Sequence, residues 1–327
     1  MEGYTKSYTV KIRPLTPIWT GDADRQNTTL RETGIIGSLR WWYEALIRGL
    51  GGTACDPTSD HRCQLSGKEK TERERISKMC PACYLFGCTG WARKFRLHIL
   101  DNNGNLKTNP IQKSDEFILH FIPLREIEDE EWALLNLTLY LIAEYGAIGG
   151  KTVLKPSDEN NRKNNPHHLD YGLIEVIESS LGMITKDKLE KYVKSERWKK
   201  DIDQNDFACV SIKNFWCVNG KYLARENNNN SSFNKVLGRN EQKEEAANII
   251  NNDKASEWLA GSRKMSKKVF SFKNPPRTFG FVKPDIIDFE QMKKRLKDVW
   301  GNENNWTFIQ GDEILKSLII KLLEELK

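Results

Sequence analysis

The stretch that decides the fold is Cys80-Pro-Ala-Cys-Tyr-Leu-Phe-Gly-Cys-Thr-Gly-Trp-Ala-Arg-Lys-Phe-Arg96. Its Cys80-x-x-Cys83 pair brings two thiolates within reach of one metal ion. Gly87 and Gly90 favour a tight turn, and the end of the stretch mixes aromatic rings with three cations. We therefore expect it to lead from a metal-bound loop into a strand that presents positive charge to a nucleic acid.

The cysteine content of the surrounding loop supports a metal site. Five of the seven cysteines lie between residues 55 and 88. The sequence has no run of about 18–20 apolar residues, and its first residues lack the apolar segment of a signal peptide. We thus expect a cytoplasmic protein, in which thiols stay reduced and clustered cysteines bind metal more often than they form disulfides.

Four cysteines are the predicted ligands of a structural zinc ion: Cys55, Cys63, Cys80 and Cys83. His61 competes with Cys63 for one position, and Cys88 is a spare thiol. Such a site would order a loop with too little apolar content to order itself. The alternatives are unliganded thiols and a redox Cys-x-x-Cys pair. The redox pair is disfavoured because Pro81 and the turn after Cys83 do not suit a strand followed by a helix.

On either side of this loop, the order of predicted elements is β-α-β-β-α-β, which is typical of a ferredoxin-like fold. Alternating apolar residues predict strands, and apolar residues at helical spacing predict helices. The elements are a strand over 8–13, a helix over 34–48, a strand over 91–100, a strand over 117–122, a helix beginning near Asp129 and a strand over 172–177.

The second half of the chain repeats this order without visible sequence similarity to the first. The predicted elements are a strand over 207–218, a helix over 244–259, strands over 268–272 and 277–282, a helix over 289–300, a strand over 306–310 and a helix over 313–326. We therefore predict an α+β protein with two tandem ferredoxin-like (RRM-like) βαββαβ domains, although the RNP aromatic signature is absent. An N-terminal domain over 1–178 would carry the cysteine-rich insertion at 51–90. A helical connector over 179–206 would join it to a C-terminal domain over 207–327 that ends in a helix.

The predicted helix over 34–48 has one apolar face and one charged face, with Thr33 as its expected N-cap. The apolar face comprises Ile35, Leu39, Trp42, Leu46 and Leu50. The charged face comprises Arg40, Glu44 and Arg48, with Trp41 beside it. A face of this kind is either solvated or suited to phosphate contacts and base stacking.

All excess positive charge lies in the first hundred residues. They contain 16 Lys and Arg against 10 Asp and Glu, whereas the remainder contains 35 of each sign. A basic surface attracts phosphate groups by neutralising them and releasing counterions. In the strand over 91–100, alternation directs Trp91 and Phe95 inward, and directs Lys94 and Arg96 outward.

Four segments closely resemble the family of the first-named RAMP-superfamily subunit of the type III-B (Cmr) CRISPR effector complex. They are Pro14-Leu-Thr-Pro-Ile-Trp-Thr-Gly21, residues 30–49, Ala54-Cys-Asp-Pro57 and residues 83–95. The resemblance is specific over residues 8–150. It implies tandem ferredoxin-like domains and a non-catalytic role in antiviral defence. Such a subunit would grip guide (CRISPR) RNA and target RNA at the 3′ side of the guide, beside other RAMP subunits of the Cmr complex and away from membranes.

The sequence departs from this family after its second predicted helix. Family members commonly continue the glycine-rich loop with further arginines and Gly-Phe-Gly, whereas Gly149-Gly-Lys-Thr-Val-Leu-Lys155 offers only Lys151 and Lys155. Glycines still let the backbone approach RNA closely. The residues predicted to contact RNA are Arg31, Arg40, Trp41, Arg48, Arg93, Lys94, Arg96, Gly149, Gly150 and Lys151.

Two other functions remain open from the sequence. Relatives in the RAMP superfamily include RNA-cleaving enzymes, and Asp22 and Asp24 lie in a polar loop after the first strand. A carboxylate there could activate a 2′-hydroxyl or bind a metal, which would make the chain a ribonuclease. The chain could also be a zinc-stabilised protein–protein adaptor that makes no RNA contact.

Overall fold

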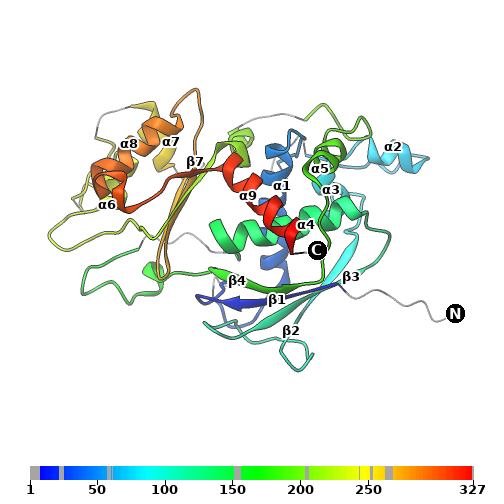
Figure 1. Cartoon of the computed structure of the whole chain (residues 1–327), viewed down its shortest axis with the longest axis horizontal. Helices are drawn as coiled ribbons and strands as arrows, with labels where there is room; N and C mark the ends of the chain where they lie inside the picture. Colours follow the sequence, from blue (N-terminus) through cyan, green and yellow to red (C-terminus); the bar gives the residue numbers. More distant parts are fainter. Residues whose placement is uncertain are drawn as a thin grey trace.

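The computed structural model describes residues 8–21, 26–56, 60, 62–150, 156–202, 206–242, 244–250, 253–261 and 268–325. The first half forms a four-stranded antiparallel sheet in the order β2-β3-β1-β4. Its strands are β1 (Tyr8–Pro14), β2 (Phe95–Leu100), β3 (Phe117–Pro123) and β4 (Ile174–Ser179). The long helices α1 (Glu32–Gly49) and α4 (Asp129–Tyr145) cover one face of this sheet (Figure 1). Order and pairing confirm the predicted ferredoxin-like fold.

Strand alternation explains how this sheet buries one face. Val10 and Ile12 of β1 are fully buried beneath the helices, whereas Arg13 is exposed on the other face. Arg13 forms ion pairs there with Glu116 and Glu175 at 3.0 and 2.9 Å. At the start of α4, the Glu131 side chain accepts a hydrogen bond from the Glu128 amide at 2.9 Å, which fixes the helix start near the expected residue.

The second half forms a second antiparallel sheet in the equivalent order β6-β7-β5-β8. Its strands are β5 (Phe215–Asn219), β6 (Val269–Lys273), β7 (Pro276–Phe281) and β8 (Ile309–Gln310). Its helices are α6 (Ser232–Leu237), α7 (Lys254–Ala260), α8 (Phe289–Trp300) and α9 (Gly311–Glu324). Figure 1 shows α6, α7 and α8 grouped away from the first sheet, whereas α9 lies beside α4. The tandem arrangement is therefore confirmed.

Several helix and strand limits differ from the sequence-based prediction; the strands expected over 91–100 and 306–310, for example, are confined to β2 and β8. Three further differences have local reasons. The strand expected over 207–218 is confined to β5, because 3₁₀ turns precede it and the Ser211 hydroxyl accepts a hydrogen bond from the Lys213 amide. The helix expected over 244–259 begins only after Asp253, which caps the Ser256 amide at 2.7 Å. Thr33 is not the N-cap of α1, since Arg31 occupies that position.

Short helices lie in the insertion and the connector: α2 (Glu72–Ile76), α3 (Pro81–Phe86) and α5 (Lys186–Val193). The 3₁₀ turns Pro166–His168 and Glu303–Asn305 lie elsewhere in the chain. The two halves share a core, because α9 packs against α4 and the end of α1 packs against the 3₁₀ turn Ile212–Asn214. Within the described ranges, every helix is too short or too polar to span a membrane.

Candidate metal centre and nucleic-acid surface

The four predicted zinc ligands meet in one place. Helix α3 begins directly after Cys80, and one turn later it carries Cys83 beside the loop that contains Cys55 and Cys63. One sulfur from each of these residues lies within 4.8 Å of the other three, and all four side chains are buried. The spacing and the all-sulfur donor set suit a tetrahedral structural metal site.

Backbone and side-chain donors orient the sulfurs. The Cys80 amide donates to Cys63 Sγ at 3.3 Å, and the Cys83 amide donates to Cys80 Sγ at 3.5 Å. Arg40 of α1 donates to Cys83 Sγ at 3.1 Å and to the Gly87 carbonyl at 2.8 Å. Donors of this kind stabilise thiolate charge, so Arg40 supports the sulfurs from outside the ligand set.

The sulfurs compete for protons. The hydrogen bond from Cys63 lowers the pKa of the Cys55 thiol. The pKa values of Cys63, Cys80 and Cys83 are raised, chiefly by their hydrogen bonds to Cys55. Because zinc binds thiolates, its binding here would release the protons that these four sulfurs carry.

Cys88 lies outside this group, in the turn that follows α3. The Cys88 amide donates to the Trp91 carbonyl and the Trp91 amide returns the bond, both at 2.9 Å. Gly90, between them, has a φ of +81°, and a Cβ there would lie 2.9 Å from Leu65 Cβ. The turn from Cys88 to Trp91 therefore requires glycine at position 90, and it packs against Leu65 of the cysteine-rich insertion just before β2 begins.

The charged face of α1 is neither solvated nor open to RNA. Glu44 is 2 % exposed and pairs with Arg40 at 2.8 Å. Arg48 is buried and donates to the Val210 and Ala54 carbonyls, both at 3.0 Å. The cysteine loop and the second domain cover this face, so Arg40 and Arg48 support protein structure instead.

Lys94 also differs from its predicted orientation. It precedes the first residue of β2 and points inward, where it is 2 % exposed and pairs with Glu131 at 2.5 Å. Its ammonium group lies 3.7 Å from the centre of the Tyr84 ring. The expectation that Lys94 faces solvent is therefore wrong, because alternation starts only at Phe95.

Of the other residues predicted to contact RNA, Trp41 and Arg93 are half-buried, whereas Arg31 and Arg96 are exposed. Trp41 is half-buried and makes edge contacts with Trp42 and Phe281, at 4.9 and 5.7 Å between ring centres. Arg93 is half-buried and donates to the Phe95 carbonyl at 2.7 Å. Burial lowers the pKa of Arg93. The charge of Glu32 raises this pKa, and the charge of Arg96 lowers it. Arg31 is the N-cap residue of α1, whereas Arg93 and Arg96 lie at the start of β2.

Glycines bring three loops together at that same end of α1. A Cβ on Gly34 would lie 2.8 Å from the Thr20 carbonyl oxygen, and a Cβ on Gly150 would lie 3.0 Å from the same atom. The Gly150 amide donates to the Trp19 carbonyl at 2.7 Å. Gly149, with a φ of +114°, would place a Cβ 2.7 Å from that carbonyl oxygen. Residues 146–150, hereafter the glycine loop, therefore lie against the start of α1.

Thr20, Asn27 and Gly34 were not singled out in the sequence. Asn27 holds the loop by accepting from the Thr20 amide at 3.0 Å and donating to the Ile18 carbonyl at 3.2 Å. A glycine in the first turn of a predicted helix was the available signal, since it indicates a close backbone approach. Of the remaining predicted residues, Lys151, His61, Asp22 and Asp24 lie outside the described residues.

Comparison with known proteins gives one family match and several structural neighbours of low sequence identity. Residues 11–154 match the sequence model of the RAMP superfamily. The structure is similar to apo Cmr1 from Pyrococcus furiosus, with a TM-score of 0.45, 12% identity and coverage of 94% of this chain and 99% of the other. A chain of the type III-B Cmr-beta complex bound to cognate target RNA and AMPPnP has a TM-score of 0.47 at 11% identity, covering 90% and 98%. A chain of a type IV-B CRISPR complex has a TM-score of 0.36 at 14% identity, covering 58% and 100%. No curated protein matches the sequence.

Proposed function

We propose that this chain is a non-catalytic, RNA-binding subunit of a type III-B CRISPR RNA-guided antiviral effector complex. In that complex it grips guide and target RNA at the 3′ side of the guide and contacts other RAMP subunits. The RAMP match covers residues 11–154, which include the start of α1, the start of β2 and the glycine loop. The proposal therefore concerns the part of the chain that carries the net positive charge.

One observation carries the proposal: the glycine loop closes against the first turn of α1, which the exposed Arg31 precedes. Arg31 at the N-cap position has no acceptor atom in its side chain, so it cannot cap the helix amides. An amide-rich helix start with a positive dipole attracts phosphate, and glycines let the RNA backbone come close. Contacts of this kind position RNA without reading its sequence, so base selection would come from pairing with the guide.

The same proposal assigns a structural zinc ion to Cys55, Cys63, Cys80 and Cys83. The four buried sulfurs match the donor type and number of closed zinc sites. Bound zinc would hold the insertion against α1 through Cys83 and Arg40, and so would fix the helix whose start faces the RNA.

The test compares matched single-cation variants in RNA binding across a salt series. Arg31→Ala and Arg96→Ala should each reduce the salt slope of single-stranded RNA affinity by about one unit. Lys191→Ala removes an exposed cation from α5, beside the opposite end of α1, and should leave the slope unchanged.

Two results would overturn this function. Crosslinking of the assembled complex that finds no RNA at the start of α1, the start of β2 or the glycine loop would remove the binding role. RNA cleavage by the purified chain that is lost in Asp22→Ala would make it a ribonuclease instead.

A further inference from the structure

The glycine loop is held at four of its five positions by partners far away in the sequence. The Ala147 carbonyl accepts from the Trp42 indole at 3.0 Å, and the Ile148 amide donates to the Gly172 carbonyl at 2.8 Å. The Gly150 amide donates to Trp19, as described above. The fourth tie comes from the second domain, where Arg277 of β7 donates to the Gly146 carbonyl at 2.9 Å.

Arg277 is suited to hold the loop and unsuited to touch RNA. It is 8 % exposed, and its second contact, at 3.2 Å, is the Asn219 side-chain oxygen. Gly146 is the C-cap of α4, so the guanidinium lies at the negative end of that helix dipole. Burial lowers the pKa of Arg277, an effect that nearby Cys217, Glu144 and Tyr145 oppose.

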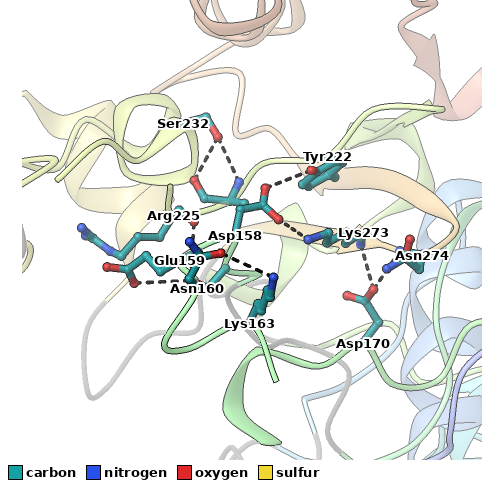
Figure 2. Close-up of polar contacts among 12 residues, drawn as sticks. Asp158, Glu159, Asn160, Lys163, Asp170, Tyr222, Arg225, Ser232, Lys273 and Asn274 are labelled. Carbon is teal, nitrogen blue, oxygen red and sulfur yellow. Dashed lines mark hydrogen bonds and ion pairs between the residues drawn. The ribbon is translucent and has the colours of Figure 1, made fainter. Parts of the chain in front are cut away.

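The chain that leaves the glycine loop is fastened to the same hairpin. Asp170 accepts hydrogen bonds from the backbone amides of Lys273 and Asn274 at 2.9 and 2.8 Å. Asp158 forms an ion pair with Lys273 and accepts from the Tyr222 hydroxyl at 2.9 Å. Figure 2 shows Asp158 and Asp170 reaching Lys273 and Asn274 from two separate points of this segment.

The hairpin β6–β7 therefore holds Gly146 at the start of the glycine loop, and Asp158 and Asp170 further along the chain. Arg277 contacts Gly146, and the backbone of the turn before β7 contacts Asp170. A loop restrained in this way loses little further freedom when it binds, and this preorganisation strengthens affinity.

We propose that Arg277 and Asp170 are positioning residues, through which the second domain keeps the glycine loop in the conformation that receives RNA. This inference rests on the proposed RNA-binding function and adds to it. It assigns the second domain a role in binding although the excess positive charge lies in the first.

The experiment uses the full-length chain with single-stranded RNA and two pairs of variants. Arg277→Met removes the donors while it fills the buried volume, and Arg277→Lys restores one charged donor. Asp170→Ala removes the acceptor, and Asp170→Asn restores a neutral one. Arg295→Met is the matched control, because Arg295 bonds to Val236, Ser256 and Asp253 within the second domain.

The first readout is hydrogen exchange of the Ile148 and Gly150 amides without RNA. Both should exchange faster in Arg277→Met and Asp170→Ala than in the wild type, and at near wild-type rates in Arg277→Lys, Asp170→Asn and Arg295→Met. Unchanged exchange in Arg277→Met and Asp170→Ala would overturn the inference, whatever the RNA measurements show.

The second readout is RNA affinity with its salt slope. Arg277→Met and Asp170→Ala should weaken binding about tenfold, because fewer molecules hold the competent loop. The slope should stay unchanged since no phosphate contact is removed. A loosened loop with wild-type affinity would overturn the positioning role. A reduced slope would make Arg277 a direct contact and overturn it as well.

If the wild-type chain bound no RNA, alone or in complex, the proposed function would fail and the positioning role with it. The hydrogen-exchange result would still show whether Arg277 and Asp170 restrain the glycine loop.

Discussion

At the scale of single residues, Glu131 is the buried acid with the clearest consequence. Burial raises its pKa to about 7, although its pairing with Lys94 opposes the shift. In the unfolded chain the same carboxyl should titrate near its ordinary value of about 4.3. Between these values the folded protein holds the proton more tightly, so the free energy of unfolding falls as pH rises from about 4.5 to 7.

The corresponding prediction compares the wild type with the double variant Lys94→Met, Glu131→Gln, which lacks both titrating groups. From pH 5 to pH 8 the free energy of unfolding of the wild type should fall by roughly 3 kcal/mol more than that of the double variant, because the raised pKa of Glu131 lies within this range. Denaturant unfolding at the two pH values measures this difference. The same pH dependence in both proteins would contradict the assignment.

The basic residues show how far the exposure of a single side chain can be predicted from sequence. Arg31 and Arg96 are exposed as predicted, whereas Arg40, Arg48 and Lys94 are committed to partners inside the protein. Each charged side chain looked solvent-facing because periodicity describes one element alone. The partners of Arg40 and Arg48 are 47 and 162 residues away, and no local pattern encodes such distances.

At the scale of elements, the cysteine insertion is held together by its four clustered cysteines. The exposed helix α2 contributes no buried residue, so the four cysteines and the Cys88–Trp91 turn fasten this region. We predict one zinc per chain. Cys83→Ser should abolish its retention and speed proteolysis near α2, whereas Cys88→Ser should retain both metal and protection.

Elemental analysis of protein purified without chelators and limited proteolysis measure these effects. Absence of zinc from the wild type would remove the centre, and its loss in Cys88→Ser would show that the ligand set is different.

Elements with strong apolar patterns were predicted well, and those set by capping were not. The apolar face of α1 and the inward residues of β1 and β2 lie where alternation and helical spacing place them. By contrast, α6 was missed, since it depends on the Ser231 hydroxyl accepting from the Asn234 amide and on Gly238 at a φ of +69°. The four-cysteine cluster was predicted from composition and spacing, whereas the loop junction at Thr20 needs tertiary structure.

At the scale of the whole molecule, α9 joins the two halves. It packs against α4 of the first half and against the 3₁₀ turn Ile212–Asn214 of the second, and Lys321 forms an ion pair with Glu144 at 2.6 Å. Leu318→Ala removes a side chain that is 1 % exposed and should cost about 2–5 kcal/mol. Exposed Lys316→Ala on the same helix should change stability by less than about 0.5 kcal/mol.

Calorimetry should show one unfolding transition for the full chain, shifted as a whole in Leu318→Ala. Two separate transitions, with the first half unaffected by the substitution, would show instead that the domains are energetically independent.

The junction at Thr20 also limits which sequences this fold accepts. The Cβ positions of Gly34 and Gly150 both lie close to the Thr20 carbonyl oxygen, at 2.8 and 3.0 Å. An alanine at either site must displace the same backbone atom, so the first displacement changes the space left at the second site. The two substitutions should therefore be non-additive. In lineages of this fold, a side chain gained at one glycine would change the cost of a side chain at the other.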